Sequence, residues 1–88
     1  ALNRAVAVSF ARGPASALPL LDDLAADPRL TRYPYLFASR GHVLQRLGDA
    51  AGAARSYRRA MELTANAAER AFLAQRLAEV SRTELPPG

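Results

Sequence analysis

The segment GDAAGAARSYRRAMEL, from Gly48 to Leu63, is rich in alanine and almost free of large branched side chains. Alanine strongly favours the helix, so the segment predicts a helix from Ala50 to about Leu63, after a turn at Gly48 and Asp49. Small side chains allow two helix axes to approach to ~8 Å. Such a helix adds stability by packing closely against its neighbours, and this requirement constrains the fold of the whole chain.

Four other helices are expected from apolar periodicity and from the residues that interrupt it. Their expected ranges are 2–11, 15–26, 35–47 and 67–82, and the longest loop is 27–34. No segment alternates convincingly between apolar and polar residues, so no sheet is expected. The predicted fold class is all-α, with about five helices that form two antiparallel hairpins and a C-terminal capping helix over residues 1–84. Residues 85–88, LPPG, are expected to form a disordered tail.

The starts of two helices depend on single residues. Inside a helix, Pro19 would remove a hydrogen bond and clash with the preceding turn. We therefore favour a later start, with Ser16 as the cap and Pro19 in the first turn, and a helix kinked at Pro19 is the alternative. Asn66 is expected to cap the last helix, with Glu69 in the position of the capping-box acid.

A chain of 88 residues forms one small domain with a modest core. The apolar stripes of the expected helices define that core. Its expected members are Leu18, Leu21, Leu24, Leu36, Phe37, Val43, Leu44, Leu47, Phe72, Leu73, Leu77 and Val80.

The second hairpin has the spacing of a tetratricopeptide repeat, a unit of two antiparallel helices. The residues that match the pattern in type or conservatively are Phe37, Gly41, Leu44, Ala53, Tyr57 and Ala60. Because Gly41 and Ala53 are small, we expect them to meet where the two helices cross. Tyr57 and Ala60 are then expected to face the next hairpin or the cap. The first hairpin resembles a degenerate copy of this unit, displaced by 36 residues.

Arginine recurs at the same spacing of 36 residues, at Arg4, Arg40 and Arg76. Arg40 stands at a position that the repeat usually makes apolar. We therefore expect its aliphatic stem to be partly buried and its guanidinium to bond to an acid or to helix-end carbonyls. Asp22 and Asp23 are the first candidate partners.

The resemblance to tetratricopeptide domains also implies a binding groove, because the first helix of each hairpin lines their concave face. The groove residues implied for the second unit are Tyr35, Ala38, His42, Gln45 and Arg46. They form a polar, partly cationic strip suited to a peptide or to an acidic partner surface. A plain solvated helix face is the alternative interpretation.

The composition argues against several kinds of site. The chain has no cysteine, which excludes disulfides and thiolate metal sites. His42 is the only histidine, and no further soft ligand or orienting acid is near it, so we predict no catalytic residue, metal ligand or cofactor, and no enzyme. All twelve basic residues are arginine, as GC-rich codon usage produces, so the net charge of +4 indicates a solvated surface more than a nucleic-acid interface. No run approaches the ~20 apolar residues of a membrane span.

Three segments together resemble a known group of proteins. They are NRAVA at 3–7, the turn at 47–48, and NAAERAFL at 66–73. They are similar to the C-terminal extension of a group of extracytoplasmic-function sigma factors, in which two promoter-binding regions precede a helical, tetratricopeptide-like tail. The similarity covers Leu2 to about Val80. It implies a cytoplasmic regulatory domain in transcription initiation, whose partners are the sigma regions of the same protein, RNA polymerase or a regulator.

A free-standing tetratricopeptide adaptor that binds peptides, unrelated to transcription, is the alternative. Because the chain begins at Ala1, we expect it to be a piece of a longer protein. In such a piece the first helix is expected to be exposed or to form a dimer contact through its apolar residues, which are Leu2, Val6, Val8 and Phe10. Specific nucleic-acid binding is not expected of this chain, because the promoter-reading regions would lie upstream of it.

Overall fold

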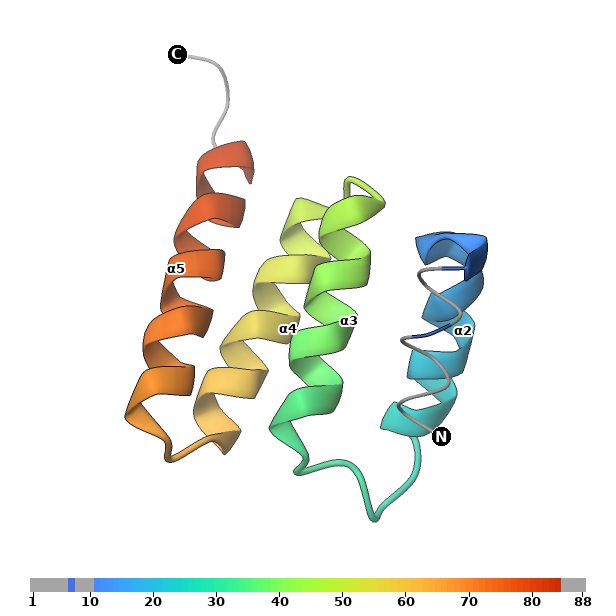
Figure 1. Ribbon diagram of the computed structural model, residues 1–88, viewed down its shortest axis with the longest axis horizontal. Coiled ribbons are helices and arrows are strands. Elements are labelled where there is room, and N and C mark those ends of the chain that lie inside the picture. Colours follow the sequence, from blue (N-terminus) through green and yellow to red (C-terminus); the bar gives the residue numbers. More distant parts are fainter. Residues whose placement is uncertain (1–6, 8–10, 85–88) are drawn as a thin grey trace.

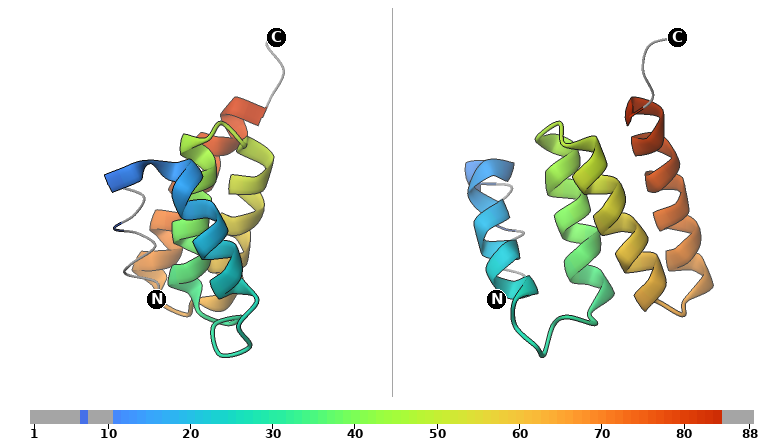
Figure 2. Two further views of the ribbon diagram at one scale, coloured as in Figure 1. Left: turned by 90° about the vertical axis from the view of Figure 1, so that its right-hand side faces the viewer. Right: turned by 180° about the vertical axis from the view of Figure 1, so that it is seen from behind.

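The computed structural model describes residue 7 and residues 11–84, the last two without their side chains. Within these residues four helices have defined bounds, and there is no strand. The helices are α2 (Pro14–Ala25), α3 (Pro34–Arg46), α4 (Ala50–Leu63) and α5 (Ala67–Glu84). Successive helices run antiparallel and pack as consecutive pairs, so that α2 and α5 lie at opposite ends of one row (Figures 1 and 2). The all-α prediction is confirmed. None of the four combines the length and the apolarity that a membrane crossing requires.

Two expected segments fall almost entirely outside the described residues: the first helix, 2–11, and the tail, 85–88. Within the first, Ala7 and Ala11 are helical. The predictions made for the apolar side chains of the first helix and for Arg4 therefore also lie outside the described part. Elsewhere the predicted bounds of α4 are confirmed, and α3 begins and ends one residue earlier than predicted.

The start of α2 corrects the prediction made for Pro19. The helix begins at Pro14, directly after Gly13, whose φ of +93° lies in the left-handed region that favours glycine. Pro14 suits the first helical position, because its missing N–H has no intrahelical partner there. Pro19 lies inside the helix, so the later start at Ser16 is wrong. Pro19 has no N–H, so it leaves the Ala15 carbonyl without its usual intrahelical donor. Ala15 is exposed, so water can reach this carbonyl.

The turn between α3 and α4 is determined locally. Gly48 has a φ of +84°, its N–H donates to the Gln45 carbonyl at 3.1 Å, and the Asp49 N–H donates to the Leu44 carbonyl at 2.9 Å. This pair of bonds is the Schellman motif that ends many helices. Asp49 then caps α4, because its Oδ1 accepts from the Gly52 N–H at 2.9 Å.

The connection between α4 and α5 confirms Asn66 as a cap and adds a third residue. The Glu69 N–H donates to Asn66 Oδ1 at 2.9 Å. In a simple capping box the Glu69 carboxylate would accept from the Asn66 N–H. Here the Thr64 hydroxyl stands between them: it donates to Glu69 Oε2 at 2.6 Å and accepts from the Asn66 N–H at 3.3 Å.

Two clusters of buried side chains form the core. One joins α2 to α3 through Ala17, Leu21, Leu36 and Val43. The other joins α3, α4 and α5 through Leu44, Ala53, Ala54, Tyr57, Ala60, Leu73 and Val80. Leu47 and Phe72 were expected in the core but are 41% and 58% exposed, so the prediction is wrong for both. Leu47 follows the last residue of α3, and Phe72 projects from α5 beside the face that packs on α4.

Arg40 is partly buried and bonded to an acid, as predicted, and it also bonds to a third helix, which was not predicted. Its Nε donates to Asp22 Oδ1 at 2.8 Å, and its Nη1 donates to Ser56 Oγ at 2.9 Å. Its side chain is 31% exposed, which confirms partial burial and selects Asp22 from the two candidate acids. Ser56 is buried, and the bond to it joins α3 to α4, whereas the bond to Asp22 joins α3 to α2.

Candidate functional site

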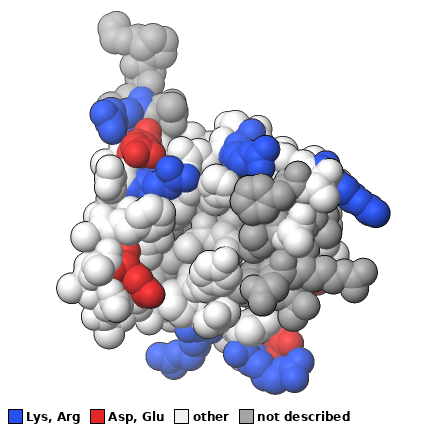
Figure 3. Space-filling view, in the orientation of Figure 1, with Lys and Arg blue, Asp and Glu red and all other residues white. Residues whose placement is uncertain are grey.

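A groove of about 370 Å³ lies between α3 and α5. We call it the aromatic groove, and its lining residues are Tyr33, Pro34, Tyr35, Ala38, Glu69, Phe72 and Leu73. Tyr33, Tyr35 and Phe72 are 46%, 47% and 58% exposed, and the two tyrosine rings lie 6.2 Å apart. Among the described residues on this face, the middle is largely uncharged, and arginines and acids lie toward the edges (Figure 3). A small domain thus presents three large aromatic side chains to solvent around one concave site.

Next to the groove, a contact between His42 and Arg76 joins α3 to α5; the two residues lie one turn beyond Ala38 and Phe72 and are not part of the groove lining. Arg76 Nη2 lies 3.1 Å from His42 Nδ1. A guanidinium can only donate, so His42 Nδ1 accepts and the ring hydrogen is on Nε2. Burial, together with the positive charges of Arg76 and Arg46, lowers the pKa of His42. Arg76 also pairs with Glu79 at 3.4 Å, and its guanidinium carbon lies 5.9 Å from the centroid of the Phe72 ring.

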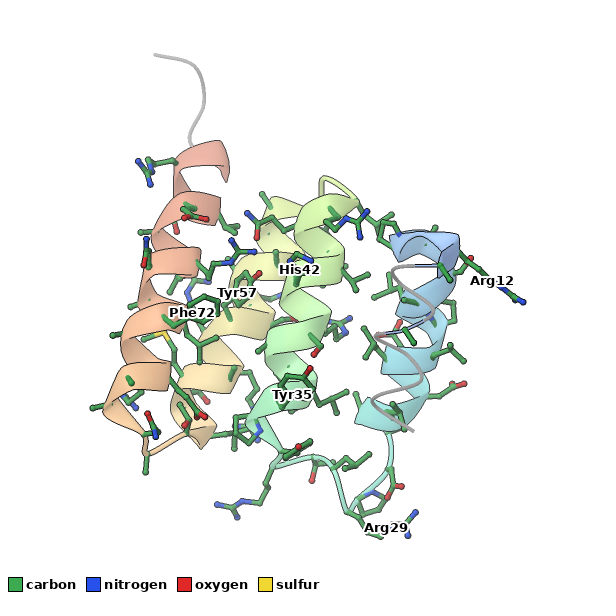
Figure 4. All side chains as sticks on the ribbon, in the orientation of Figure 1. Arg12, Arg29, Tyr35, His42, Tyr57 and Phe72 are labelled. Carbon is green, nitrogen blue, oxygen red and sulfur yellow. The ribbon has the colours of Figure 1, made fainter. Side chains whose placement is uncertain are left out.

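Tyr57 forms the buried floor behind this contact. Its side chain is 1% exposed and belongs to the cluster that joins α3, α4 and α5. The hydroxyl donates to Gln45 Oε1 at 3.0 Å. Burial raises the pKa of Tyr57, so this hydroxyl keeps its proton and remains a donor at neutral pH. Figure 4 shows Tyr35 and His42 on α3 and Phe72 on α5, with Tyr57 on α4, which packs against both helices.

The close approach of α3 and α4 depends on Gly41. A Cβ added there would lie 2.9 Å from two atoms of the Tyr57 ring, closer than real Cβ contacts. We expected Ala53 to be the partner of Gly41, but the three atoms nearest to such a Cβ all belong to Tyr57. Ala53 and Ala60 are fully buried in the same cluster. The small residues at the predicted crossing therefore make room for the tyrosine ring.

The five residues predicted to line the groove fall into separate groups. Tyr35 and Ala38 line the aromatic groove. His42 and Gln45 bond to side chains of α5 and α4 respectively. Arg46 is exposed at the end of α3, where its charge affects His42.

Sequence reasoning missed the contribution of α5. Glu69, Phe72 and Leu73 line the groove, and Arg76 lies one turn beyond Phe72, with its guanidinium beside the Phe72 ring. These four residues have the i, i+3, i+4, i+7 spacing of one helix face, and that spacing was the available signal. The prediction placed Phe72 in the core together with Leu73, so this face of α5 was not recognised as part of a groove. Within the described residues, no group of three histidines or acids is placed to hold a metal ion.

The comparisons with known proteins add one relative. No protein-family model matches the chain, and no solved structure matches it. An uncharacterized protein of Rhizobium meliloti (strain 1021) is 42% identical to the chain over 76 residues, which cover 86% of this chain and 18% of that protein. The chain therefore spans less than a fifth of the length of this relative.

The lowered pKa of His42 predicts a pH-dependent stability. The folded-state pKa lies below the ordinary 6.5, so between the two values the unfolded state binds more protons. The contribution of His42 to stability is complete above pH 6.5 and is lost as the pH falls through the folded pKa. We expect the melting temperature, followed by circular dichroism, to be lower near pH 5 than near pH 7.

His42→Gln is the matched control, because an amide oxygen can accept from Arg76 but does not titrate. The chain has no second histidine, so the difference between the two proteins isolates this side chain. Equal pH dependence of the two melting temperatures would contradict the assignment.

Proposed function

We propose that this chain is a protein-interaction domain of the tetratricopeptide type. The antiparallel packing of successive helices, the lack of a side chain at Gly41 under the Tyr57 ring, and the buried Ala53 and Ala60 support this architecture. The observation that carries the proposal is the aromatic groove between α3 and α5. Exposed aromatic side chains around a concave site are typical of surfaces that bind other proteins.

We further propose that the domain is the C-terminal regulatory extension of an extracytoplasmic-function sigma factor that acts in transcription initiation. This part rests on the resemblance of NRAVA, the 47–48 turn and NAAERAFL to such extensions. The Rhizobium protein is several times longer than the matched segment, which is compatible with a domain attached to other regions. The proposed partners are the sigma regions of the same protein, RNA polymerase or a regulator, in the cytoplasm. The domain would need no cofactor and catalyse no reaction.

The coding sequence upstream of this chain provides the first test. We expect it to encode the two promoter-binding sigma regions. The second test is a calorimetric titration of the domain with those regions and with core polymerase. Beside it, the domain is titrated with promoter duplex at low and at physiological salt. We expect binding to the sigma regions or to polymerase, and duplex binding that is weak and lost as salt rises, as for non-specific phosphate contacts.

Two outcomes would overturn the sigma-factor role. One is an upstream sequence without sigma regions, which would favour the free-standing peptide-binding adaptor. The other is sequence-selective duplex binding that survives physiological salt, without binding to the sigma regions or to polymerase.

A further inference from the structure

We propose that the aromatic groove binds an extended peptide segment that places one aromatic or branched apolar side chain beside Phe72 and an adjacent Asp or Glu side chain on Arg76. The inference rests on the proposed interaction function and specifies the chemistry of the partner. It follows from the size of the groove, from the exposure of its walls and from the distribution of charge along it.

The size of the groove favours one anchoring side chain in an extended segment. Its volume of about 370 Å³ is at the lower end of the roughly 300–1,000 Å³ of ligand pockets. A helix is about 10–12 Å wide with its side chains and needs a longer surface to place successive turns. An extended strand or polyproline segment presents single side chains to a short pocket.

The walls select an apolar anchor. Pro34, Ala38 and Leu73 line the groove, and the rings of Tyr35 and Phe72 are about half exposed beside them. An aromatic or branched side chain entering the groove removes both its own surface and that of the rings from water.

The charges along the groove select an acid at one end. Arg76 lies next to the Phe72 ring, and its side chain is 28% exposed. Two of its five N–H donors are directed to His42 and to Glu79, the latter at a long 3.4 Å. Tyr57 is a further neighbour of the Arg76 guanidinium. The remaining N–H groups of Arg76 can donate to a carboxylate of the partner. His42 is neutral, so Arg46 and Arg76 outweigh Glu79 at this end.

The opposite end of the groove carries Glu69, whose carboxylate accepts from the Thr64 hydroxyl. Glu69 thus lies in the groove, whereas Arg76 lies just beyond Phe72 on the other side, so an acid of the partner is attracted to Arg76 and repelled from Glu69. Both α3 and α5 continue beyond this contact, to Arg46 and Glu84, so the partner chain can continue along them. For this reason we assign the carboxylate to a side chain and not to a chain terminus.

Peptides are selected from a random library with amidated C-termini by binding to the immobilised domain. The affinity of each selected peptide is then measured by fluorescence polarisation. We expect selected peptides to contain an aromatic or branched residue next to Asp or Glu. Replacing that acid by its amide in the peptide should weaken binding, and raising the salt concentration should reduce the difference. These peptide-side comparisons need no protein variant, so they remain informative if a variant loses its fold.

Two protein variants have matched controls. Phe72→Ala is expected to weaken binding at least about tenfold, as for a central aromatic contact. Its control is Leu20→Ala on α2, an exposed apolar residue outside the groove.

Arg76→Gln is expected to bind the acidic peptide and its amide counterpart equally well. Its control is Arg58→Gln, exposed on α4. Melting curves establish that each variant is folded.

Selected peptides without an acid, affinity that Phe72→Ala leaves unchanged, or equal binding of acid and amide peptides to the unaltered domain would each overturn the inference. Tight binding only through a free C-terminal carboxylate would also overturn it.

The same Phe72→Ala variant is titrated with the sigma regions and with polymerase. Undiminished binding there would remove the groove from the proposal but retain the interaction domain. Peptide binding without binding to either protein, together with an upstream sequence that lacks sigma regions, would refute the sigma-factor role and retain the groove chemistry.

Discussion

Tyr57→Ala is expected to lose roughly 3–5 kcal/mol of unfolding free energy, the range measured when a large buried aromatic is reduced to alanine. Tyr57 is the largest of the fully buried side chains, and it contacts the cluster that joins α3, α4 and α5. At roughly 0.05–0.15 kcal/mol per residue, a domain of 88 residues has a total stability of only about 4–13 kcal/mol. Urea unfolding followed by circular dichroism should show this loss as a lower midpoint, and a total stability at the low end of the range would leave the variant partly unfolded in water.

Tyr57→Phe separates the ring from the hydroxyl. It keeps the packing and removes the bond to Gln45, so it should cost about 0.5–1.5 kcal/mol. If Tyr57→Ala were as stable as Tyr57→Phe, the ring would not be the centre of this core.

Gly41→Leu is expected to destabilise the domain by at least about 1–3 kcal/mol, the usual cost of overpacking a core. Even the first carbon of the new side chain would lie 2.9 Å from the Tyr57 ring, and the remaining carbons would have to displace the ring or separate α3 from α4. The measurement is again the free energy of unfolding in urea. Ala51→Leu adds the same kind of side chain to an exposed position of α4 and should change stability by no more than about 0.5 kcal/mol.

The cause can be isolated by combining two substitutions. Gly41→Ala introduces only the clashing carbon, and in a Tyr57→Leu background the ring that it meets is absent. We expect Gly41→Ala to cost less in that background than alone, which is a coupling between contacting residues. Equal costs in both backgrounds would mean that the Tyr57 ring is not what excludes a side chain at Gly41.

Features that depend on a few neighbouring residues were predictable from the sequence. The bounds of α4, the turn at Gly48 and Asp49, and the cap at Asn66 were all anticipated. Their hydrogen bonds close between residues three to five positions apart, so local sequence is sufficient to specify them. An acid partner for Arg40, either Asp22 or Asp23, was anticipated over a longer distance, because the repeat pattern places an unusual charge at a packed position, and the structure selects Asp22.

Other features depended on which surfaces face one another. α2 continues through Pro19, against the local preference of proline, and Ala17 and Leu21 on either side of it are fully buried. Phe72 was assigned to the core because its neighbours in the periodic pattern are buried, yet it remains exposed at the aromatic groove.

The amino-acid sequence by itself thus determined the helices, their turns and the all-α class, because these follow from short-range hydrogen bonds and periodicity. Only the tertiary structure decided that Tyr57 covers Gly41, that His42 meets Arg76, and that an aromatic groove separates α3 from α5. Periodicity marks the apolar side of a helix. Whether that side is covered depends on the position of a neighbouring helix that is distant in the sequence.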